Sequence, residues 1–442
     1  MSEHYFMHKI LFIILTPLLV VGCNAEAGDK KQPLKGNVVF LHPDGTGVGH
    51  WNILRLITAG PDGKTHWDQM EGLGLYRPHQ KNSLVTTSHA GATVHAYGKK
   101  VHFDSYGMDK KQPLTAVSGK PMSIMQEAME AGIRVGVVNS GHIAEPGTGV
   151  FLASSESRKF RTEIAEKILS SGADLMFSGG EIYTIPKGTI GFHGQEGLRE
   201  DGRNLLKEAE EAGYTVIFTI EQLLALPSDV KKVIGIFAAK NTYNATTEEK
   251  QIAAGLPHYN EGQPTFAQMV EVALRILSND PAQQFFLVAE EEGTDNFSNS
   301  ANASGAIEAL KRTDAAIATT MQFMAQRDVQ DTLLIVAADS DAGHPSAWAN
   351  DGVPGDVEVL PLVSETGAPI DGVKGPGTAP FVSQPDAQGV TFKFGVAWPL
   401  SDDSFGSVVA RSHGFKSELL GVTVDNSDIY KICYEVLFNV RL

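Results

Sequence analysis

Cysteine is nearly absent from this sequence: the 442 residues include only Cys23 and Cys433. Two cysteines exclude a disulfide framework and any zinc cluster built from several thiolates. Basic residues are also in the minority, 36 against 52 acidic ones, which gives a formal net charge of −16. This balance argues against nucleic-acid binding as a function, and it means that an anionic ligand has to be attracted by a local positive site.

Long hydrophobic runs are scarce as well. The run at residues 10–21 follows His8 and Lys9 and falls short of the about 20 residues of a membrane span, so it predicts a signal peptide. It ends in Gly22 and Cys23, a pattern that resembles a bacterial lipobox, in which the cysteine is acylated. We therefore expect residues 1–22 to be a lipoprotein signal peptide. An ordinary signal peptide followed by an incidental cysteine is the alternative.

This reading predicts the location of the protein. Lipidation of Cys23 would anchor the chain to a membrane, with residues 23–36 as a polar tether. Asn24 is not the aspartate linked to inner-membrane retention, so we expect the periplasmic side of the bacterial outer membrane. A secreted or soluble periplasmic protein is the alternative.

Beyond the tether, apolar strand-like runs alternate with helical patterns. Several runs are apolar at consecutive positions, as expected for strands that are covered on both faces. The helix expected at residues 265–279 begins with a capping box formed by Thr265 and Gln268. The pattern predicts an α/β fold with a mostly parallel central sheet and helices on both faces. The expected strands are residues 37–41, 135–139, 174–178, 214–218, 233–237, 285–289 and 333–338.

Two segments interrupt the alternation. Residues 239–264 are polar and lack periodicity, which indicates a surface excursion. Residues 342–410 are rich in Gly, Pro, Asp and Ser, with a strand expected at 390–396. We interpret this second segment as a crown-like insertion over the active-site face, so that residues 37–442 form one domain.

Acidic residues follow three of the expected strands. Asp44 comes after the first, Glu290–Glu292 and Asp295 after a later one, and Asp339–Asp341 after the last. In parallel sheets functional sites gather at the carboxyl ends of strands. Consecutive glutamates at a buried strand end repel one another unless a cation compensates them. A turn at Asp44 and a solvated run of charge at the glutamates are the alternatives.

A serine lies at a further turn. Ser88 precedes the small residues Ala90, Gly91 and Ala92, which permit a closely packed helix. A serine at a helix N-terminus suits a nucleophile, because the free N–H groups and the helix dipole favour an anionic substrate. A simple helix cap is the alternative. Together with the acidic strand ends, the serine points to a metal-assisted hydrolase.

In their order and spacing, these motifs resemble the alkaline phosphatase family over nearly the whole chain after the tether. Further matches lie at residues 152–158, 178–180, 185–188, 202–206 and 425–430. The resemblance implies metal-dependent hydrolysis of phosphate monoesters through a phosphoserine intermediate, for phosphate scavenging. It also implies small phosphorylated substrates and suggests a homodimer.

The resemblance assigns roles to matching residues. Ser88 is the nucleophile, and Arg158 clamps two phosphate oxygens. Zinc and magnesium are the metals implied. The ligands implied for them are Asp44, Glu290, Asp295, Asp339 and His413.

Several positions depart from the family pattern. Thr87 replaces an aspartate before the nucleophile, and Asn299 and Ser340 stand where histidine ligands are expected. A site richer in oxygen favours harder cations, so magnesium, manganese or calcium could take the place of zinc. Further candidates for metal binding are Glu145, Thr148, Asn299, Ser340, Asp341 and His344.

The remaining histidines receive plainer interpretations. His89 and His95 flank Ser88, and His89 could touch the substrate phosphate. Those expected to be structural or on the surface are His42, His102, His142 and His193.

Two rival functions stay open. The insertion could shape a pocket for a phosphodiesterase of the same superfamily. Alternatively, the missing histidines could leave a catalytically weak surface protein that is stabilised by metal.

Overall fold

The computed structural model describes residues 34–327, 330–349 and 357–442. The expected signal peptide and Cys23 lie outside these residues. Within the described part of the chain, none of the helices combines the length and the hydropathy that a membrane span requires.

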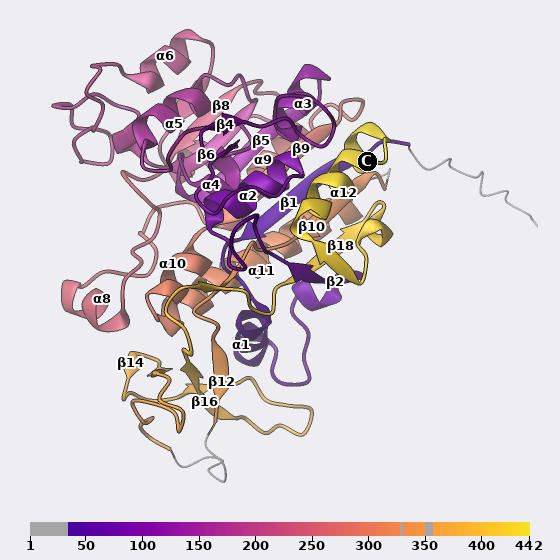
Figure 1. Cartoon of the computed structure of the whole chain (residues 1–442). Coiled ribbons are helices and arrows are strands. Elements are labelled where there is room, and N and C mark those ends of the chain that lie inside the picture. The colour runs from indigo at the N-terminus through magenta and orange to yellow at the C-terminus, as the bar shows by residue number, and fades with distance from the viewer. Residues whose placement is uncertain (1–33, 328–329, 350–356) are drawn as a thin grey trace, which may run out of the picture. The chain divides into compact units, whose positions relative to one another are not determined.

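A ten-stranded sheet carries the fold (Figure 1), in the order β19-β2-β18-β10-β1-β9-β5-β6-β8-β7. The pairs from β10 through β7 are all parallel, so the predicted mostly parallel sheet is confirmed. The seven expected strands are all present, as β1 (Asn37–Pro43), β5 (Arg134–His142), β6 (Leu175–Gly179), β7 (Thr215–Ile217), β8 (Val233–Ile236), β9 (Phe285–Glu291) and β10 (Thr332–Val336).

Three strands at the other end of the sheet are additions to the predicted set. They are β2 (Gly72–Arg77), β18 (Val409–Gly414) and β19 (Thr423–Asp425). β18 runs antiparallel to both of its neighbours, β10 and β2. β2 alternates exposed and buried residues and contains two glycines, so it lacks the continuous apolar run that reveals the central strands.

Helices cover both faces of the sheet because consecutive residues of each strand point to opposite sides. On β1, Val38 and Phe40 join one apolar cluster, whereas Val39 and Leu41 join the other. The first cluster includes α2 (Ser88–Tyr97), α3 (Ile124–Glu130), α5 (Arg161–Leu169), α6 (Leu205–Glu211) and α12 (Asn426–Phe438). The second includes α1 (Val48–Thr58), α7 (Ile220–Leu224), α9 (Phe266–Leu277) and α11 (Ala303–Ala325).

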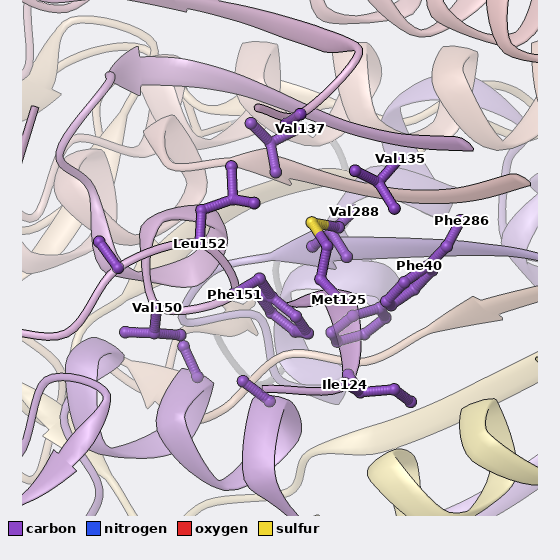
Figure 2. Packing of buried hydrophobic residues seen from close by; sticks show 14 of the residues in the cluster. Phe40, Ile124, Met125, Val135, Val137, Val150, Phe151, Leu152, Phe286 and Val288 are labelled. Atoms are coloured by element: carbon purple, nitrogen blue, oxygen red, sulfur yellow. The ribbon is translucent and has the colours of Figure 1, made fainter. Parts of the chain in front are cut away.

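Local sequence signals account for individual elements of these layers. The capping box predicted at Thr265 and Gln268 is present at the start of α9. On the α2 side of the sheet, the ring of Phe151 packs edge-on against Phe40 and Phe286 (Figure 2). Large aromatic residues on neighbouring strands thus fix the distance between the sheet and the helices on this side.

The Gly- and Pro-rich segment folds mainly as a small separate sheet that contacts α1 and α11 (Figure 1). Its strands are β12 (Ser346–Trp348), β13 (Ile370–Gly372), β14 (Gly375–Pro376), β15 (Phe381–Val382) and β16 (Lys393–Ala397). At its base, β11 (Asp341–Ala342) pairs with β17 (Asp403–Ser404). β18 lies in the central sheet, so the excursion returns to the main body before residue 410.

Several short elements complete the described residues. They are β3 (Met108–Asp109), β4 (Gln112–Pro113), α4 (Pro146–Gly149), α8 (Glu248–Ala254), α10 (Gly293–Asn299) and the 3-10 helices η1 (Trp67–Gln69), η2 (Glu181–Tyr183) and η3 (Ser417–Leu419). α8 lies within the polar segment 239–264.

A buried carboxyl group on α8 makes stability depend on pH. Burial and the nearby Asp371 raise the pKa of Glu248 from 4.5 to about 8. The folded state therefore keeps a proton that the unfolded state releases, and this contribution to stability is lost as pH rises from 4.5 to about 8. We expect Glu248→Gln to stabilise the protein by on the order of 2 kcal/mol at alkaline pH and little at about pH 5.

Thermal unfolding across this pH range checks the prediction. Glu261→Gln, which replaces an exposed carboxyl group in the same polar segment, is the control and should leave the pH profile unchanged. Identical profiles for Glu248→Gln and the parent protein would contradict it.

Candidate active site

Carboxylates from three adjacent strands converge at one edge of the sheet. β10, β1 and β9 are neighbours, and Asp339, Asp44 and Glu290 lie at or just beyond their carboxyl ends. All three side chains are fully buried. The sheet therefore gathers residues that are far apart in sequence: 246 positions separate Asp44 from Glu290, and 49 separate Glu290 from Asp339.

Two groups of ligand atoms share Asp44. Single donor atoms of His42, Asp44 and Asp339 lie within 4.8 Å of one another, and so do those of Asp44, Glu290 and Glu292. Of the two roles expected for His42, the surface position is wrong, because the ring is fully buried and lies within the first group. β1 explains this placement, since residues 42 and 44 point to the same side of an extended chain.

Several oxygen atoms of these carboxylates have no hydrogen-bonding partner among the described residues. Both carboxylate oxygens of Asp44 and of Asp339, and one oxygen of Glu292, are buried without a hydrogen bond among the described residues. Burial, reinforced by neighbouring carboxylates, raises the pKa of Glu292 and Asp339 well above the usual range. Such a set of unpaired oxygens fits divalent cations, which remove the repulsion and supply the missing partners.

Glu290 is held by the residues that surround its carboxylate. The amide of Asn139 donates to Glu290 and also lies 2.9 Å from the hydroxyl of Thr148, so these three side chains form one group. A Cβ atom on Gly147 would lie 1.9 Å from Glu290 Oε1, and only glycine permits this approach. Glu291, in contrast, accepts hydrogen bonds from Ser140 and Tyr259 and belongs to the supporting structure.

The first turn of α2, which begins at Ser88, packs against this cluster. Thr87 caps the helix by accepting a hydrogen bond from the amide of Ala90, and Ser88 is the first helical residue. A Cβ atom on Gly91 would lie 2.5 Å from Cβ of Asp339, so the first turn of α2 packs directly on that aspartate. Small residues after the serine thus bring a helix N-terminus, which favours anions, next to the carboxylates.

Arg158 extends toward the same region and has an acidic partner. Its Nη2 lies 3.4 Å from Glu145 Oε2, while the other oxygen of Glu145 lies 2.9 Å from His142 Nε2. Although burial opposes ionisation, His142 and Arg158 lower the pKa of Glu145 to about 2. Glu145 therefore orients Arg158, a role for which Thr87 is not available.

A second group of oxygen atoms surrounds Asp295. The amide nitrogen of Asn299 lies 3.0 Å from both oxygens of Asp295 and 3.4 Å from Asp403 Oδ1. Gly45 has a positive φ of 63°, and a Cβ there would lie 2.7 Å from Asp295 Oδ1. Asp403 is a residue that the sequence interpretation missed, although it forms an acidic pair with Asp402 at the end of the excursion.

The structure does not bring His413 to this site. His413 pairs with Leu334 in the first half of β10, whereas Asp339 follows the end of that strand. Its Nδ1 lies 3.5 Å from Glu71 instead. β18 runs antiparallel to β10, so the chain moves away from the carboxylates after Asp403. His413 therefore lies toward the edge of the sheet opposite to the carboxyl ends of β1, β9 and β10.

Of the remaining candidates for metal binding, one has an unpaired side chain and two pair with each other. The hydroxyl of Ser340 is buried without a hydrogen-bonding partner among the described residues. Asp341 lies 2.8 Å from Nδ1 of His344 and accepts a hydrogen bond from the amide of Ser407. Asp341 and His344 thus pair with each other instead of joining the clusters around Asp44.

Comparisons with known proteins identify the family. The family model described as alkaline phosphatase matches residues 35–350. An alkaline phosphatase of Gadus morhua is 25% identical over 340 residues, covering 69% of this chain and 68% of the relative. That of Escherichia coli K12 is 25% identical over 350 residues, covering 70% of each chain.

Solved structures agree on the fold. The alkaline phosphatase from the Antarctic bacterium TAB5 superposes with a TM-score of 0.69 at 20% identity, covering 92% of this chain and 99% of that one. The Thermus thermophilus alkaline phosphatase gives a TM-score of 0.68 at 18% identity, with coverages of 95% and 96%. The chain therefore belongs to the alkaline phosphatase family of phosphoric monoester hydrolases.

Proposed function

We propose that the protein hydrolyses phosphate monoesters through a phosphoserine intermediate and serves to release phosphate from small phosphorylated compounds. The observation that carries this proposal is the packing of the Ser88 helix turn on Asp339, through Gly91. It combines a nucleophile, a helix N-terminus and unpaired carboxylates in one buried place. Arg158 adds the positive charge that a phosphate requires.

The first step joins Ser88 to phosphorus. The oxygen of Ser88 attacks in line, the phosphorus–oxygen bond to the substrate alcohol breaks, and the alcohol leaves with a proton. Arg158, held by Glu145 at 3.4 Å, orients two equatorial oxygens of the phosphoryl group. In the second step water attacks the phosphoserine and regenerates the hydroxyl of Ser88.

Divalent cations fit the residues around Ser88. Asp44, Asp339, Glu290 and Glu292 would hold them, with Asp295, Asn299 and Asp403 as a further group. When bound, such cations supply the positive charge that lowers the pKa of the nucleophile and stabilises the attacking and leaving oxygens. Zinc and magnesium are the metals that the family implies.

An assay with paired substrates tests the function. We expect the purified protein to release the alcohol from an aryl phosphate monoester and to be much less active on the matched aryl diester. A monoester has three free phosphate oxygens and a diester has two, so after a bidentate contact with Arg158 only the monoester keeps a free oxygen for the cations at Asp44 and Asp339. Preferential cleavage of the diester would establish the phosphodiesterase alternative. Failure with both substrates in the metal-loaded protein would favour a metal-stabilised surface protein.

We also propose that the protein is a lipoprotein of the bacterial outer membrane, facing the periplasm. The support is the sequence around Cys23, which lies outside the described residues. In a Gram-negative host, the wild-type protein is expected to fractionate with membranes, and Cys23→Ala to lose acylation and normal maturation. Mass spectrometry of the mature N-terminus is the measurement. A soluble wild-type protein that is cleaved elsewhere would refute the lipobox interpretation.

A further inference from the structure

One imidazole ring in the carboxylate cluster lacks a hydrogen-bonding partner. His42 is fully buried, and neither ring nitrogen makes a hydrogen bond within the described residues. Nδ1 lies 3.4 Å from Glu290 Oε1, and Nε2 lies 3.9 Å from Asp339 Oδ1. A buried polar group without a partner costs about 1–3 kcal/mol. The position of His42 is therefore explained best by a partner that the described residues do not supply.

The surrounding elements direct this ring toward the unpaired carboxylates. His42 lies beside Glu290 in the parallel register of β1 and β9. The ring of His95 packs edge-on at 5.6 Å on another side of His42. His95 differs from His42 in one respect: its Nε2 is hydrogen-bonded to the hydroxyl of Tyr76 at 2.6 Å, and only its Nδ1 lacks a partner among the described residues. The two neighbouring imidazoles thus have different environments.

We propose that His42 is a metal ligand in this protein: Nε2 binds a divalent transition-metal ion together with Asp44 and Asp339, and Nδ1–H donates to Glu290. Histidine ligands commonly give their second N–H to a carboxylate, which fixes the ring and increases its donor strength. Imidazole nitrogen and carboxylate oxygen are both donors that zinc accepts, and three protein ligands leave a coordination position open, as in catalytic zinc sites. β1 thereby supplies the imidazole that Ser340, next to Asp339, does not provide.

This assignment rests on the proposed function only because it requires a cation at Asp44 and Asp339. A cysteine in place of His42 offers a direct test, because a thiolate bound to Co²⁺ gives an intense charge-transfer absorption that an uncoordinated thiol does not. We expect Co²⁺-loaded His42→Cys to gain this absorption relative to the wild type. We expect His42→Gln to bind Co²⁺ and Zn²⁺ at least about 10-fold more weakly, measured by competition with a chelator.

His95→Cys is the matched control, since it places a buried thiol beside His42 but outside the group of donor atoms. It should gain no charge-transfer band. Circular dichroism of the metal-free proteins verifies folding, and His42→Gln provides the binding comparison if His42→Cys does not fold.

Two results would overturn the assignment. One is a folded His42→Cys protein without the new band, and the other is unchanged metal affinity in His42→Gln. Either would leave His42 as a buried structural residue beside Glu290 and Asp339. These measurements involve no phosphate ester. A variant that shows the band, in a protein that fails to hydrolyse phosphomonoesters, would therefore refute the proposed function and leave the ligand assignment intact.

Discussion

Replacing Ser88 with alanine is expected to abolish the phosphoenzyme and to lower turnover of an aryl phosphomonoester by at least about 10³-fold, equivalent to ~4 kcal/mol in the activation barrier. The reason is chemical, because alanine has no oxygen with which to attack phosphorus. The substitution removes one hydroxyl at the start of α2, where Thr87 provides the cap, so the fold should be retained. Steady-state kinetics and acid trapping of the phosphoenzyme are the measurements.

Ser83→Ala is the control for this experiment. Ser83 precedes the same helix in the loop before the cap and has no role in the proposed chemistry. It should leave both turnover and phosphoenzyme formation unchanged. Recovery of a phosphoryl group on a residue other than Ser88 at low pH would disprove the assignment of the nucleophile.

Removing the metals with a chelator is expected to abolish activity. Restoring single metals is then expected to show whether hard cations or the borderline cation zinc reactivate the protein. Asp295 and Asp403 offer carboxylate oxygens to a bound cation, and the neighbouring Asn299, whose amide nitrogen faces both carboxylates, supplies no imidazole. Magnesium, manganese and calcium prefer such ligands, whereas zinc gains more from imidazole or thiolate. After chelation, full activity should therefore require one of the three harder cations, and zinc alone should restore less.

A double substitution tests the physical reason. Asn299→His with Asp403→His introduces two imidazoles beside Asp295 and should shift the preference toward zinc. Elemental analysis of the purified proteins, followed by reconstitution at fixed pH, measures the shift. Stoichiometric zinc in the wild type, combined with no reactivation by a harder cation, would contradict the expectation and would mean that other side chains complete this site.

The parts of the site that sequence could predict are those attached to continuous apolar strands. β1, β9 and β10 are buried on both faces, so their apolar runs mark where each strand ends. Once parallel pairing is assumed, Asp44, Glu290 and Asp339 must meet at one edge. This prediction depends only on where the strands end. It does not depend on loop conformations or on side chains elsewhere in the fold, and for this reason it was correct.

Other parts depend on information that the sequence does not display. The displacement of His413 arises from the direction of β18, which an apolar run cannot reveal, and Asp403 takes the position near Asp295 instead. His42 lies in β1, which is buried at every position. The sequence pattern of such a strand does not distinguish a histidine that faces the functional site from one that packs in the core. The contact between Glu145 and Arg158 depends on two side-chain conformations. Strand directions and side-chain conformations of this kind are visible only in the three-dimensional structure.

The pairing of β11 with β17 has an evolutionary consequence. Asp341 lies opposite Ser404, and Ala342 opposite Asp403, so residues 343–402 leave and rejoin the body at one place. Closing a longer loop costs only about 0.6 kcal/mol for each doubling of its length. Natural selection can therefore lengthen, shorten or exchange this whole segment while Asp403 stays beside Asp295.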